Sequence, residues 1–174
     1  MEYIPNEWQF IDPELNLIFP WYTKPFLDEL VTWDLLDKEV LELGGGFSTI
    51  WWNNKCHYVH TVETNKLWAQ QIRDIYSNVN ILDTIILNKK YDIIIIDNDD
   101  CDRDNMIILA LELIKDKGII ICDNWMQPEV WICKNPFLLE RFEHKIFKQP
   151  NHPNWQTAYF IIDKTYENKR KEKT

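Results

Sequence analysis

Carboxylate side chains stand at the ends of four apolar runs in this 174-residue chain, where predicted strands would finish. They are Glu42 within residues 39–43, Glu63 after 57–62, Asp97 after 91–96, and Asp123 with Asn124 after 119–122. Because ligands bind outside the carboxyl ends of parallel strands, we expect these groups to share one site. Such a site attracts an amine or a sulfonium by charge and accepts hydrogen bonds from hydroxyl groups.

Three of the four glycines in the chain, Gly44, Gly45 and Gly46, are consecutive. A chain with so little glycine concentrates it where the backbone needs a positive φ or comes very close to another group. A strand, a glycine turn and a helix in succession present the helix N-terminus to a nucleotide-like ligand. The alternative interpretation is a tight turn that binds nothing.

The spacing of Glu63 and the composition of the turn narrow the choice of ligand. Glu63 lies 21 residues after Glu42. At this spacing a carboxylate can accept hydrogen bonds from both hydroxyls of a ribose; the alternative is an exposed carboxylate at a strand end. The dinucleotide fingerprint G-x-G-x-x-G would need a third glycine where Thr49 stands, and the Gly-Lys-Ser/Thr of a phosphate loop is absent. Glu42 also disfavours a pyrophosphate, because the two negative groups repel each other.

The elements that hold these residues alternate between helices and strands. Helices are predicted at 24–36, 47–54, 66–76, 103–115 and 136–142, and strands at 39–43, 57–62, 78–82, 91–96, 119–122, 144–147 and 157–162. The pattern predicts one domain over residues 1–174 with a doubly wound α/β fold, in which a mostly parallel seven-stranded sheet is the middle of three layers. Residues 1–22 are expected to form an irregular leading segment, and 164–174 a flexible charged tail.

The composition excludes several classes of partner. The net charge is −9 and the isoelectric point about 4.9, so an acidic surface would repel nucleic acid. No apolar run is long enough to span a membrane. The four cysteines form no CxxC pair, which indicates reduced thiols in a cytoplasmic protein. Abundant Ile, Asn and Lys suggest an AT-rich genome.

The order of these motifs resembles that of class I S-adenosylmethionine-dependent methyltransferases. Glu42-Leu43-Gly44-Gly45-Gly46 is similar to the E/D-x-G-x-G first motif, and residues 61–63, 91–97 and 117–124 are similar to later motifs. The resemblance covers roughly residues 20–162. A small bacterial and viral branch of this family has segments similar to Pro20-Trp21-Tyr22-Thr23 and Trp51-Trp52. This resemblance suggests a viral origin, and a viral protein of this kind would be located in the host cytoplasm.

The resemblance implies S-adenosyl-L-methionine as the cofactor, together with a set of binding residues. In such a protein the first motif holds the methionine and ribose part, the second strand end the ribose hydroxyls, and the third the adenine. The implied cofactor-binding residues are Tyr22, Glu42, Gly44, Gly45, Gly46, Ser48, Glu63, Asp83 and Asp97.

Methyl transfer requires alignment of the acceptor with the methyl group and, for a hydroxyl, help in removing a proton. The candidate catalytic residues are Asp97, Asp99 and Asp123, with Asp99 as general base or acceptor contact if Arg103 pairs with a neighbouring carboxylate. Asp97, Asp123 and Asn124 also resemble the Mg²⁺ ligands of the catechol O-methyltransferase type. Relatives without a metal use the first aspartate for the cofactor, and Asp123-Asn124 could instead cap a turn, so both interpretations stay open.

These features together predict methyl transfer from S-adenosylmethionine to a small-molecule or sugar acceptor, at oxygen. A non-catalytic nucleoside-binding or regulatory protein is one alternative, and a nucleotide-dependent oxidoreductase is another. Little sequence outside the core elements remains to build an acceptor pocket. The acceptor is therefore small, or a second subunit completes the pocket in a homodimer.

Overall fold

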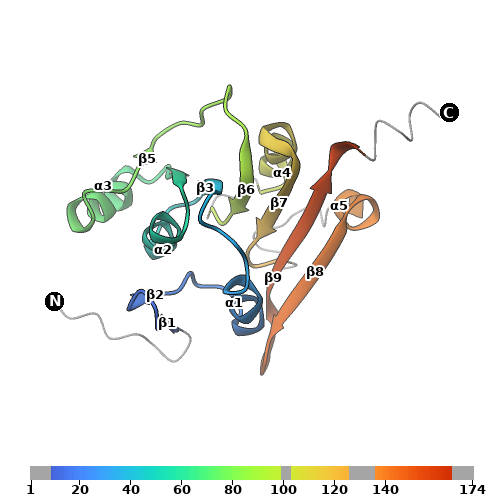
Figure 1. Cartoon of the computed structure of the whole chain (residues 1–174), viewed down its shortest axis with the longest axis horizontal. Helices are drawn as coiled ribbons and strands as arrows, with labels where there is room; N and C mark the ends of the chain where they lie inside the picture. Colours follow the sequence, from blue (N-terminus) through green and yellow to red (C-terminus); the bar gives the residue numbers. More distant parts are fainter. Residues whose placement is uncertain (1–8, 99–102, 126–135, 166–174) are drawn as a thin grey trace.

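The computed structural model describes residues 9–98, 103–125 and 136–165. Its centre is a seven-stranded sheet with the strand order β5-β4-β3-β6-β7-β9-β8 (Figure 1). The strands are β3 (Glu39–Leu43), β4 (Tyr58–Val62), β5 (Ile81–Leu82), β6 (Tyr91–Ile96), β7 (Ile114–Cys122), β8 (Glu143–Gln149) and β9 (His152–Asp163). Strands β3, β4, β5, β6 and β7 are parallel to one another, and β9 is antiparallel to both β7 and β8. The predicted mostly parallel seven-stranded sheet is confirmed.

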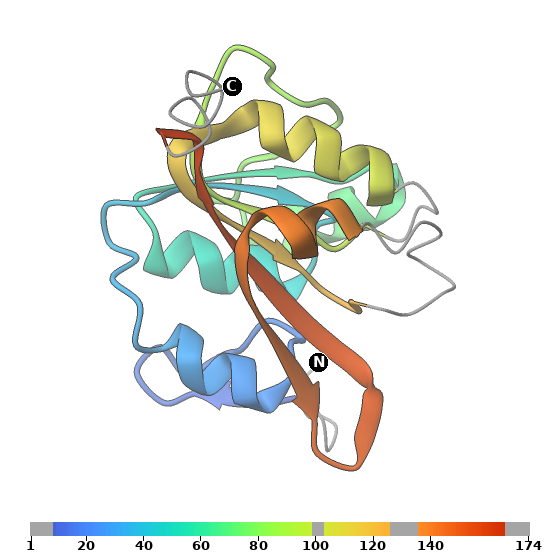
Figure 2. The same cartoon turned by 90° about the vertical axis from the view of Figure 1, so that its right-hand side faces the viewer.

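Helices cover both faces of this sheet and make the three expected layers (Figure 2). The helices are α1 (Lys24–Leu30), α2 (Phe47–Lys55), α3 (Lys66–Ile75), α4 (Arg103–Leu113) and α5 (Pro136–Arg141). Helices α1 and α2 pack on one face, and α4 and α5 on the other. Helix α3 packs beside β5 through Ala69 and Ile72. Among the described residues, no helix combines the length and apolar character needed to cross a bilayer.

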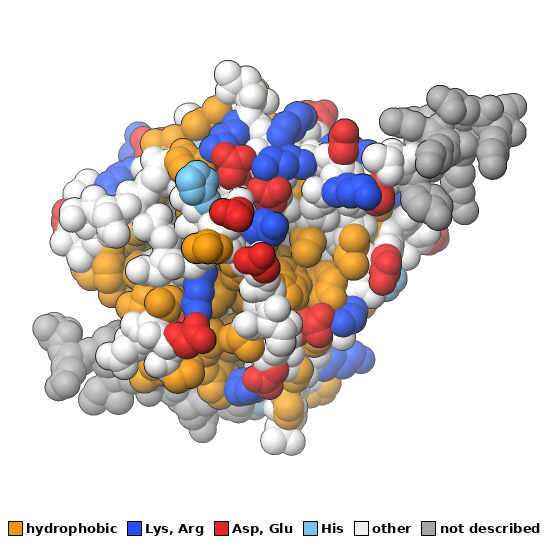
Figure 3. Space-filling model, viewed as in Figure 1, with side chains coloured by type: hydrophobic (Ala, Val, Ile, Leu, Met, Phe, Trp, Pro, Cys, Tyr) orange, Lys and Arg blue, Asp and Glu red, His pale blue; other side chains and the backbone are white. Residues whose placement is uncertain are grey.

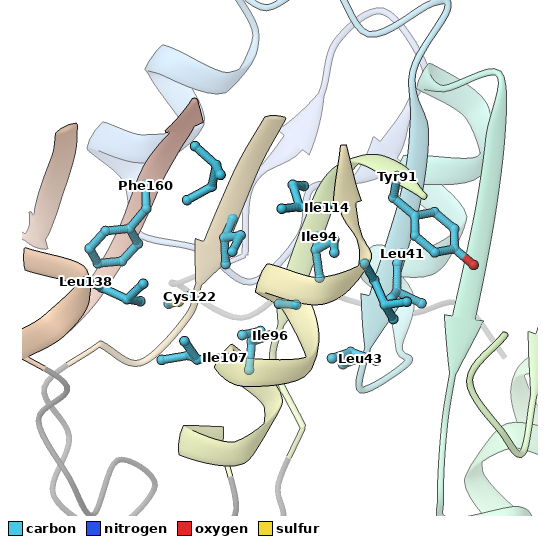
Figure 4. Close-up of a cluster of buried hydrophobic side chains, with 14 of the residues drawn as sticks. Leu41, Leu43, Tyr91, Ile94, Ile96, Ile107, Ile114, Cys122, Leu138 and Phe160 are labelled. Carbon is cyan, nitrogen blue, oxygen red and sulfur yellow. The ribbon is translucent and has the colours of Figure 1, made fainter. Parts of the chain in front are cut away.

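The central strands are apolar on both faces because each face is covered by helices. Side chains of β6 alternate between the two layers: Ile94 and Ile96 face α4, whereas Ile93 and Ile95 face α1 and α2. Figure 4 shows the α4 side of the core, where Ile107 of α4 belongs to one cluster with side chains from β3, β6, β7 and β9. Described cysteines contribute as small apolar groups, and both Cys56 and Cys122 are free thiols.

The chain crosses the sheet in two directions from its middle. From β3 it proceeds through β4 to β5, and it then returns to the other side of β3 to form β6 and β7. The carboxyl ends of β3 and β6 therefore lie at the switch point, where an open α/β sheet leaves a crevice for a ligand. In Figure 2 the parallel strands run toward the right, so this edge lies on that side of the molecule.

Several boundaries differ from the sequence-based expectation. Helix α1 ends at Leu30 rather than 36, and β7 begins at Ile114, within the predicted helix, so that Gly118 lies inside a strand. A Cβ at Gly118 would lie 2.6 Å from Ile114 and 2.8 Å from the Asp92 carbonyl, so close approach explains this glycine. The leading segment, expected to be irregular, contains a two-stranded hairpin, β1 (Ile11–Asp12) and β2 (Leu17–Ile18).

The hairpin β1–β2 is tied to the rest of the fold by Asp12. This buried carboxylate accepts a hydrogen bond from Trp51 Nε1 (2.7 Å) and lies 3.3 Å from the ammonium group of Lys55, both on α2. These hydrogen bonds and the Lys55 charge hold the pKa of Asp12 below its usual value despite its burial. Together with the ion pair between Glu14 and Lys55 (2.7 Å), this anchor fixes a segment whose sequence carries little strand signal.

Candidate functional site

The glycine turn after β3 is forced by its surroundings at Gly44. This residue has φ +94, a left-handed conformation that side chains with a Cβ rarely adopt. A Cβ there would lie 2.5 Å from the Asp97 carbonyl oxygen and 2.6 Å from the Asn98 nitrogen. Gly44 is therefore required both by its own backbone and by the end of β6, which passes directly against it.

Gly45 and Gly46 have different roles in the turn. A Cβ on Gly45 would lie 2.7 Å from the Thr61 methyl group, so the protein itself fills that space. At Gly46 the nearest atom to such a Cβ is 3.9 Å away, the hydroxyl of Ser48, so the space beside it is open. Gly46 is also the N-cap of α2. Of the three glycines predicted to bind the ligand, Gly46 is the one that has open space beside it for a ligand.

Glu42 is completely buried, in the layer between β3 and α2. Its carboxylate accepts hydrogen bonds from the hydroxyls of Ser48 (2.6 Å), Thr49 (2.5 Å) and Thr61 (2.9 Å). Burial raises the pKa of Glu42 to about 7, and the three hydroxyl donors limit the rise. The carboxylate of Glu42 thus influences the site through its charge. The hydroxyl of Ser48, which was predicted to bind the cofactor, donates its hydrogen bond to Glu42.

Glu63 follows β4 and reaches back to the glycine turn. One carboxylate oxygen accepts a hydrogen bond from the backbone N–H of Gly45 (3.0 Å), and the other from that of Asn65 (2.6 Å). Trp68 of α3 donates its indole N–H to the Gly45 carbonyl (2.7 Å), so the turn is held from two sides. A carboxylate has about four acceptor positions, and these two bonds leave capacity for hydroxyl donors.

Asp83 lies after β5 in the same row of strand ends. Leu82 accepts a backbone hydrogen bond from the N–H of Glu63 (3.1 Å), which places the two strand ends side by side. The side chain of Asp83 is 56% exposed and lies 3.7 Å from the Arg73 guanidinium. Asp83 is therefore at the edge of the site, and the basic residue beside it belongs to α3.

Tyr22 enters the site from the opposite side of the sheet edge. Its ring is fully buried, and its hydroxyl accepts a hydrogen bond from the indole N–H of Trp52 (3.3 Å). Burial and the nearby charges of Asp97, Glu42 and Asp123 raise its pKa well above 10. The structure therefore brings Tyr22 together with three of the predicted carboxylates.

Asp123 lies at the end of β7 beneath the leading segment. It is buried and accepts a hydrogen bond from the hydroxyl of Thr157 on β9 (2.8 Å), which in turn accepts one from the Thr23 backbone N–H (3.1 Å). Burial raises the pKa of Asp123 to about 6. Asn124 has φ 50, which asparagine tolerates better than most residues, and it forms the turn after β7.

Arg103, the first residue of α4, joins the ends of β6 and β7. Its side chain is only 1% exposed. Nε donates to the Asn98 carbonyl (2.7 Å), Nη1 donates to the Asp123 carbonyl (2.7 Å), and Nη2 lies 3.5 Å from Asp97 Oδ1. Sequence reasoning expected this arginine to pair with an acidic neighbour, and the structure adds two backbone contacts.

The Mg²⁺ ligand set expected from Asp97, Asp123 and Asn124 is not supported. Residues 9–98, 103–125 and 136–165 contain no group of three or more His, Cys, Asp or Glu side chains placed to hold a metal ion. Asp123 directs an oxygen at Thr157, and the Arg103 guanidinium already stands beside Asp97. A divalent ion there would face a fixed positive charge. Asp99, the candidate general base, lies outside the described residues.

One cavity lies at the other end of the sheet. It has a volume of about 370 Å³ and is lined by residues before β3 and at the amino ends of β6 and β7, including Trp33, Leu35, Ile93 and Ile119. Figure 3 shows this face, where hydrophobic side chains gather below a mixed group of acidic and basic ones. No strand carboxyl end reaches it, so we place the site at the glycine turn.

Sequence reasoning missed the residues that support the predicted ones. Thr49, Thr61 and Thr157 hold the two buried carboxylates, and Trp68 holds the turn. A weak signal was present for Thr61, because alternation along β4 places it on the same face as Glu63. No signal linked Thr157 to Asp123, which lies 34 residues earlier.

No protein-family model matches the chain, and no curated protein matches it in sequence. Solved structures do match its fold. A putative caffeoyl-CoA O-methyltransferase from Staphylococcus aureus has a TM-score of 0.61, with 20% identity over 79% of this chain and 81% of that one. The O-methyltransferase from Bacillus cereus in complex with SAH has a TM-score of 0.59, with 18% identity over 72% and 74%. The N-methyltransferase NodS from Bradyrhizobium japonicum has 0.55, with 15% identity over 80% and 98%.

These likenesses agree with the internal features of the chain. The chain has the strand order of an open α/β sheet, a glycine turn at its switch point and carboxylates at successive strand ends. The chain has the fold of the class I S-adenosylmethionine-dependent methyltransferases.

Proposed function

We propose that this protein transfers a methyl group from S-adenosylmethionine to a small-molecule or sugar acceptor, at oxygen. The observation that carries the proposal is the gathering of the glycine turn, Glu42 and Glu63 at the switch point of a methyltransferase fold. Two of the similar structures are the O-methyltransferase from Bacillus cereus and the putative caffeoyl-CoA O-methyltransferase from Staphylococcus aureus.

The residues present fit this cofactor. Gly46 leaves open space at the N-terminus of α2, and Glu63 has acceptor capacity for ribose hydroxyls. The charge of Glu42 favours a cation nearby, which suits a sulfonium and an ammonium better than a pyrophosphate. When bound, S-adenosylmethionine supplies a methyl group on a positively charged sulfur.

The residues of the chain orient the acceptor and accept its proton. Asp97 is the described carboxylate of this edge that combines partial exposure, 27%, with a place at the end of a central strand. It can therefore contact an acceptor hydroxyl and take its proton as the new bond forms. Asp123 is buried and supports the site by charge.

An aromatic pair beside the site supports an uncharged, ring-shaped acceptor. Trp21, which precedes Tyr22, is 56% exposed and contacts Trp155 edge-on with ring centroids 6.3 Å apart. Trp155 lies on the same face of β9 as Thr157, which binds Asp123, at a distance of about 7 Å along the strand. The face of an indole ring suits a sugar or aromatic ring, and the surrounding carboxylates disfavour an anion.

Calorimetric titration with S-adenosylhomocysteine and, separately, with NAD tests the proposal. We expect micromolar binding of the first and none of the second. Transfer of labelled methyl to neutral glycosides and phenols is then measured. Preference for NAD would indicate an oxidoreductase, and tight binding without transfer to any acceptor would indicate a non-catalytic binding protein.

The aromatic pair has its own test and a matched control. Trp21→Ala should lower methyl transfer without changing the affinity for S-adenosylhomocysteine. Val31→Ala removes another exposed apolar side chain, 55% exposed, at the end of α1, and should change neither quantity. Equal transfer rates in the two variants would remove Trp21 from acceptor recognition.

A further inference from the structure

The buried guanidinium of Arg103 occupies the position that matters most for a metal-assisted reaction. The ion expected from the sequence would take oxygen ligands from Asp97, Asp123 and Asn124, at the ends of β6 and β7, and Arg103 already bridges these two strand ends. The guanidinium is completely enclosed and cannot lose its charge. It donates to one carbonyl oxygen on each side and stands beside the partly exposed carboxylate of Asp97.

The carboxylate of Asp123, the second acidic residue of the expected ligand set, is also bound to a protein partner. The carboxylate of Asp123 accepts the Thr157 hydroxyl (2.8 Å) and is buried, so it does not present an open pair of oxygens. Mg²⁺ demands near-octahedral oxygen coordination at about 2.0–2.1 Å and retains several waters, which needs open space. The part of the site that the structure describes offers no such group of acidic ligands.

We propose that Arg103 is a positioning residue that stands in the place of a divalent cation, so that this chain carries out its methyl transfer without a metal ion. The methyl-transfer part of this proposal rests on the proposed function, but the absence of a metal-binding site at Asp97 and Asp123 can be tested by itself. It implies an acceptor that does not need chelation of two adjacent hydroxyls, and a proton that is removed by a carboxylate.

The structure also shows what Arg103 positions. Asn98, whose carbonyl accepts from Nε, and the carbonyl of Asp97 are the groups that press against Gly44. Asp97 in turn donates its backbone N–H to the Leu43 carbonyl (2.8 Å). Arg103 therefore holds the segment that shapes the glycine turn. All three guanidinium nitrogens are used, a fork that a lysine cannot reproduce.

The metal part is tested by electron paramagnetic resonance of Mn²⁺ added to the wild-type protein, with and without S-adenosylhomocysteine. We expect no bound ion at Mn²⁺ concentrations up to about 1 mM, the weak end of protein sites for such ions. Ion binding whose affinity is unchanged in both Asp97→Ala and Asp123→Ala does not involve these two carboxylates and agrees with the proposal. One bound Mn²⁺ per chain that either substitution abolishes would overturn it. The titration without cofactor remains informative if S-adenosylhomocysteine does not bind, so the two proposals fail separately.

The positioning part is tested with Arg103→Met, Arg103→Lys and a matched control, Lys115→Met. Lys115 joins β7 to Asp92 of β6 (2.8 Å) and Glu39 of β3 (3.1 Å) at the opposite end of the same strands. Both Arg103 variants should weaken binding of S-adenosylhomocysteine about tenfold or more, the scale for hydrogen bonds to a charged group, whereas Lys115→Met should leave it within about twofold. Wild-type affinity in Arg103→Lys, or equal losses in Arg103→Met and Lys115→Met, would refute the positioning role. If the Arg103 variants do not fold, the Mn²⁺ titration still decides.

Discussion

The buried carboxylate of Glu42 makes a prediction that needs no ligand. The pKa of Glu42 is raised to about 7 in the folded protein from its ordinary value of 4.5, chiefly by burial. The folded protein therefore keeps the proton at pH values where the unfolded chain has lost it. Ionisation of Glu42 therefore destabilises the folded protein. This destabilisation is absent below about pH 4.5, grows between pH 4.5 and 7, and is complete above pH 7.

The size of the effect follows from the same two values. A pKa raised from 4.5 to about 7 corresponds to roughly 3 kcal/mol of folding free energy at high pH, at about 1.4 kcal/mol per pKa unit. Glu42→Gln has nearly the same shape and no charge, so it removes this penalty. The amide still loses some hydrogen bonding to Ser48, Thr49 and Thr61, but that loss does not depend on pH in this range.

Urea unfolding of wild type and Glu42→Gln at pH 5 and pH 8 measures the effect. The free energy of unfolding of the variant minus that of the wild type should rise by about 2–3 kcal/mol between the two pH values. Glu39→Gln, on the same strand, is the control. Lys89 and Lys115 lower the pKa of Glu39, so its substitution should destabilise by a similar amount at both pH values. A Glu42→Gln difference that changes by less than about 0.5 kcal/mol would refute the reasoning.

Three other outcomes are expected. Glu63→Ala should weaken binding of S-adenosylhomocysteine by about 1–3 kcal/mol in calorimetry, and unchanged affinity would place Glu63 outside the cofactor site. Gly44→Ala should lower the free energy of unfolding by about 1–3 kcal/mol in thermal or urea unfolding, because Gly44 has a positive φ. Gly46→Ala should leave the free energy of unfolding nearly unchanged but weaken cofactor binding, because its Cβ would fill open space. The reverse pattern would contradict these roles. Raising the pH from 6 to 8 ionises Glu42 and should strengthen the binding of cationic S-adenosylmethionine about 3–10-fold. The change for S-adenosylhomocysteine should be smaller. An equal pH dependence for the two ligands would show that Glu42 does not act on the sulfonium.

Elements with a strong local signal were predicted closely from the sequence. The strands at 39–43 and 91–96 have the predicted bounds, because an apolar run flanked by polar or glycine residues has few other ways to be buried. The antiparallel pair at the end of the chain was predicted too short. Strands β8 and β9 extend to Glu143–Gln149 and His152–Asp163 because they pair with each other beyond the rest of the sheet. Such pairing is a non-local property that no window of sequence contains.

For the candidate site, local sequence determined which residues are present at the strand ends and that glycine is needed after β3. It also determined the fold class, since the alternation of apolar runs and helices admits few layered arrangements. These inferences depend on backbone sterics and on the burial of apolar side chains, both of which act over short stretches of chain.

Only the tertiary structure decided what those residues do to one another. Burial against α2 gives Glu42 its raised pKa, and the approach of the β6 end, more than 50 residues away, makes Gly44 obligatory. The position of Arg103 between the carbonyl groups of Asn98 and Asp123, and beside Asp97, was likewise set by the tertiary structure. Charge, desolvation and steric contact depend on distances in space, and the order of residues along the chain does not specify them.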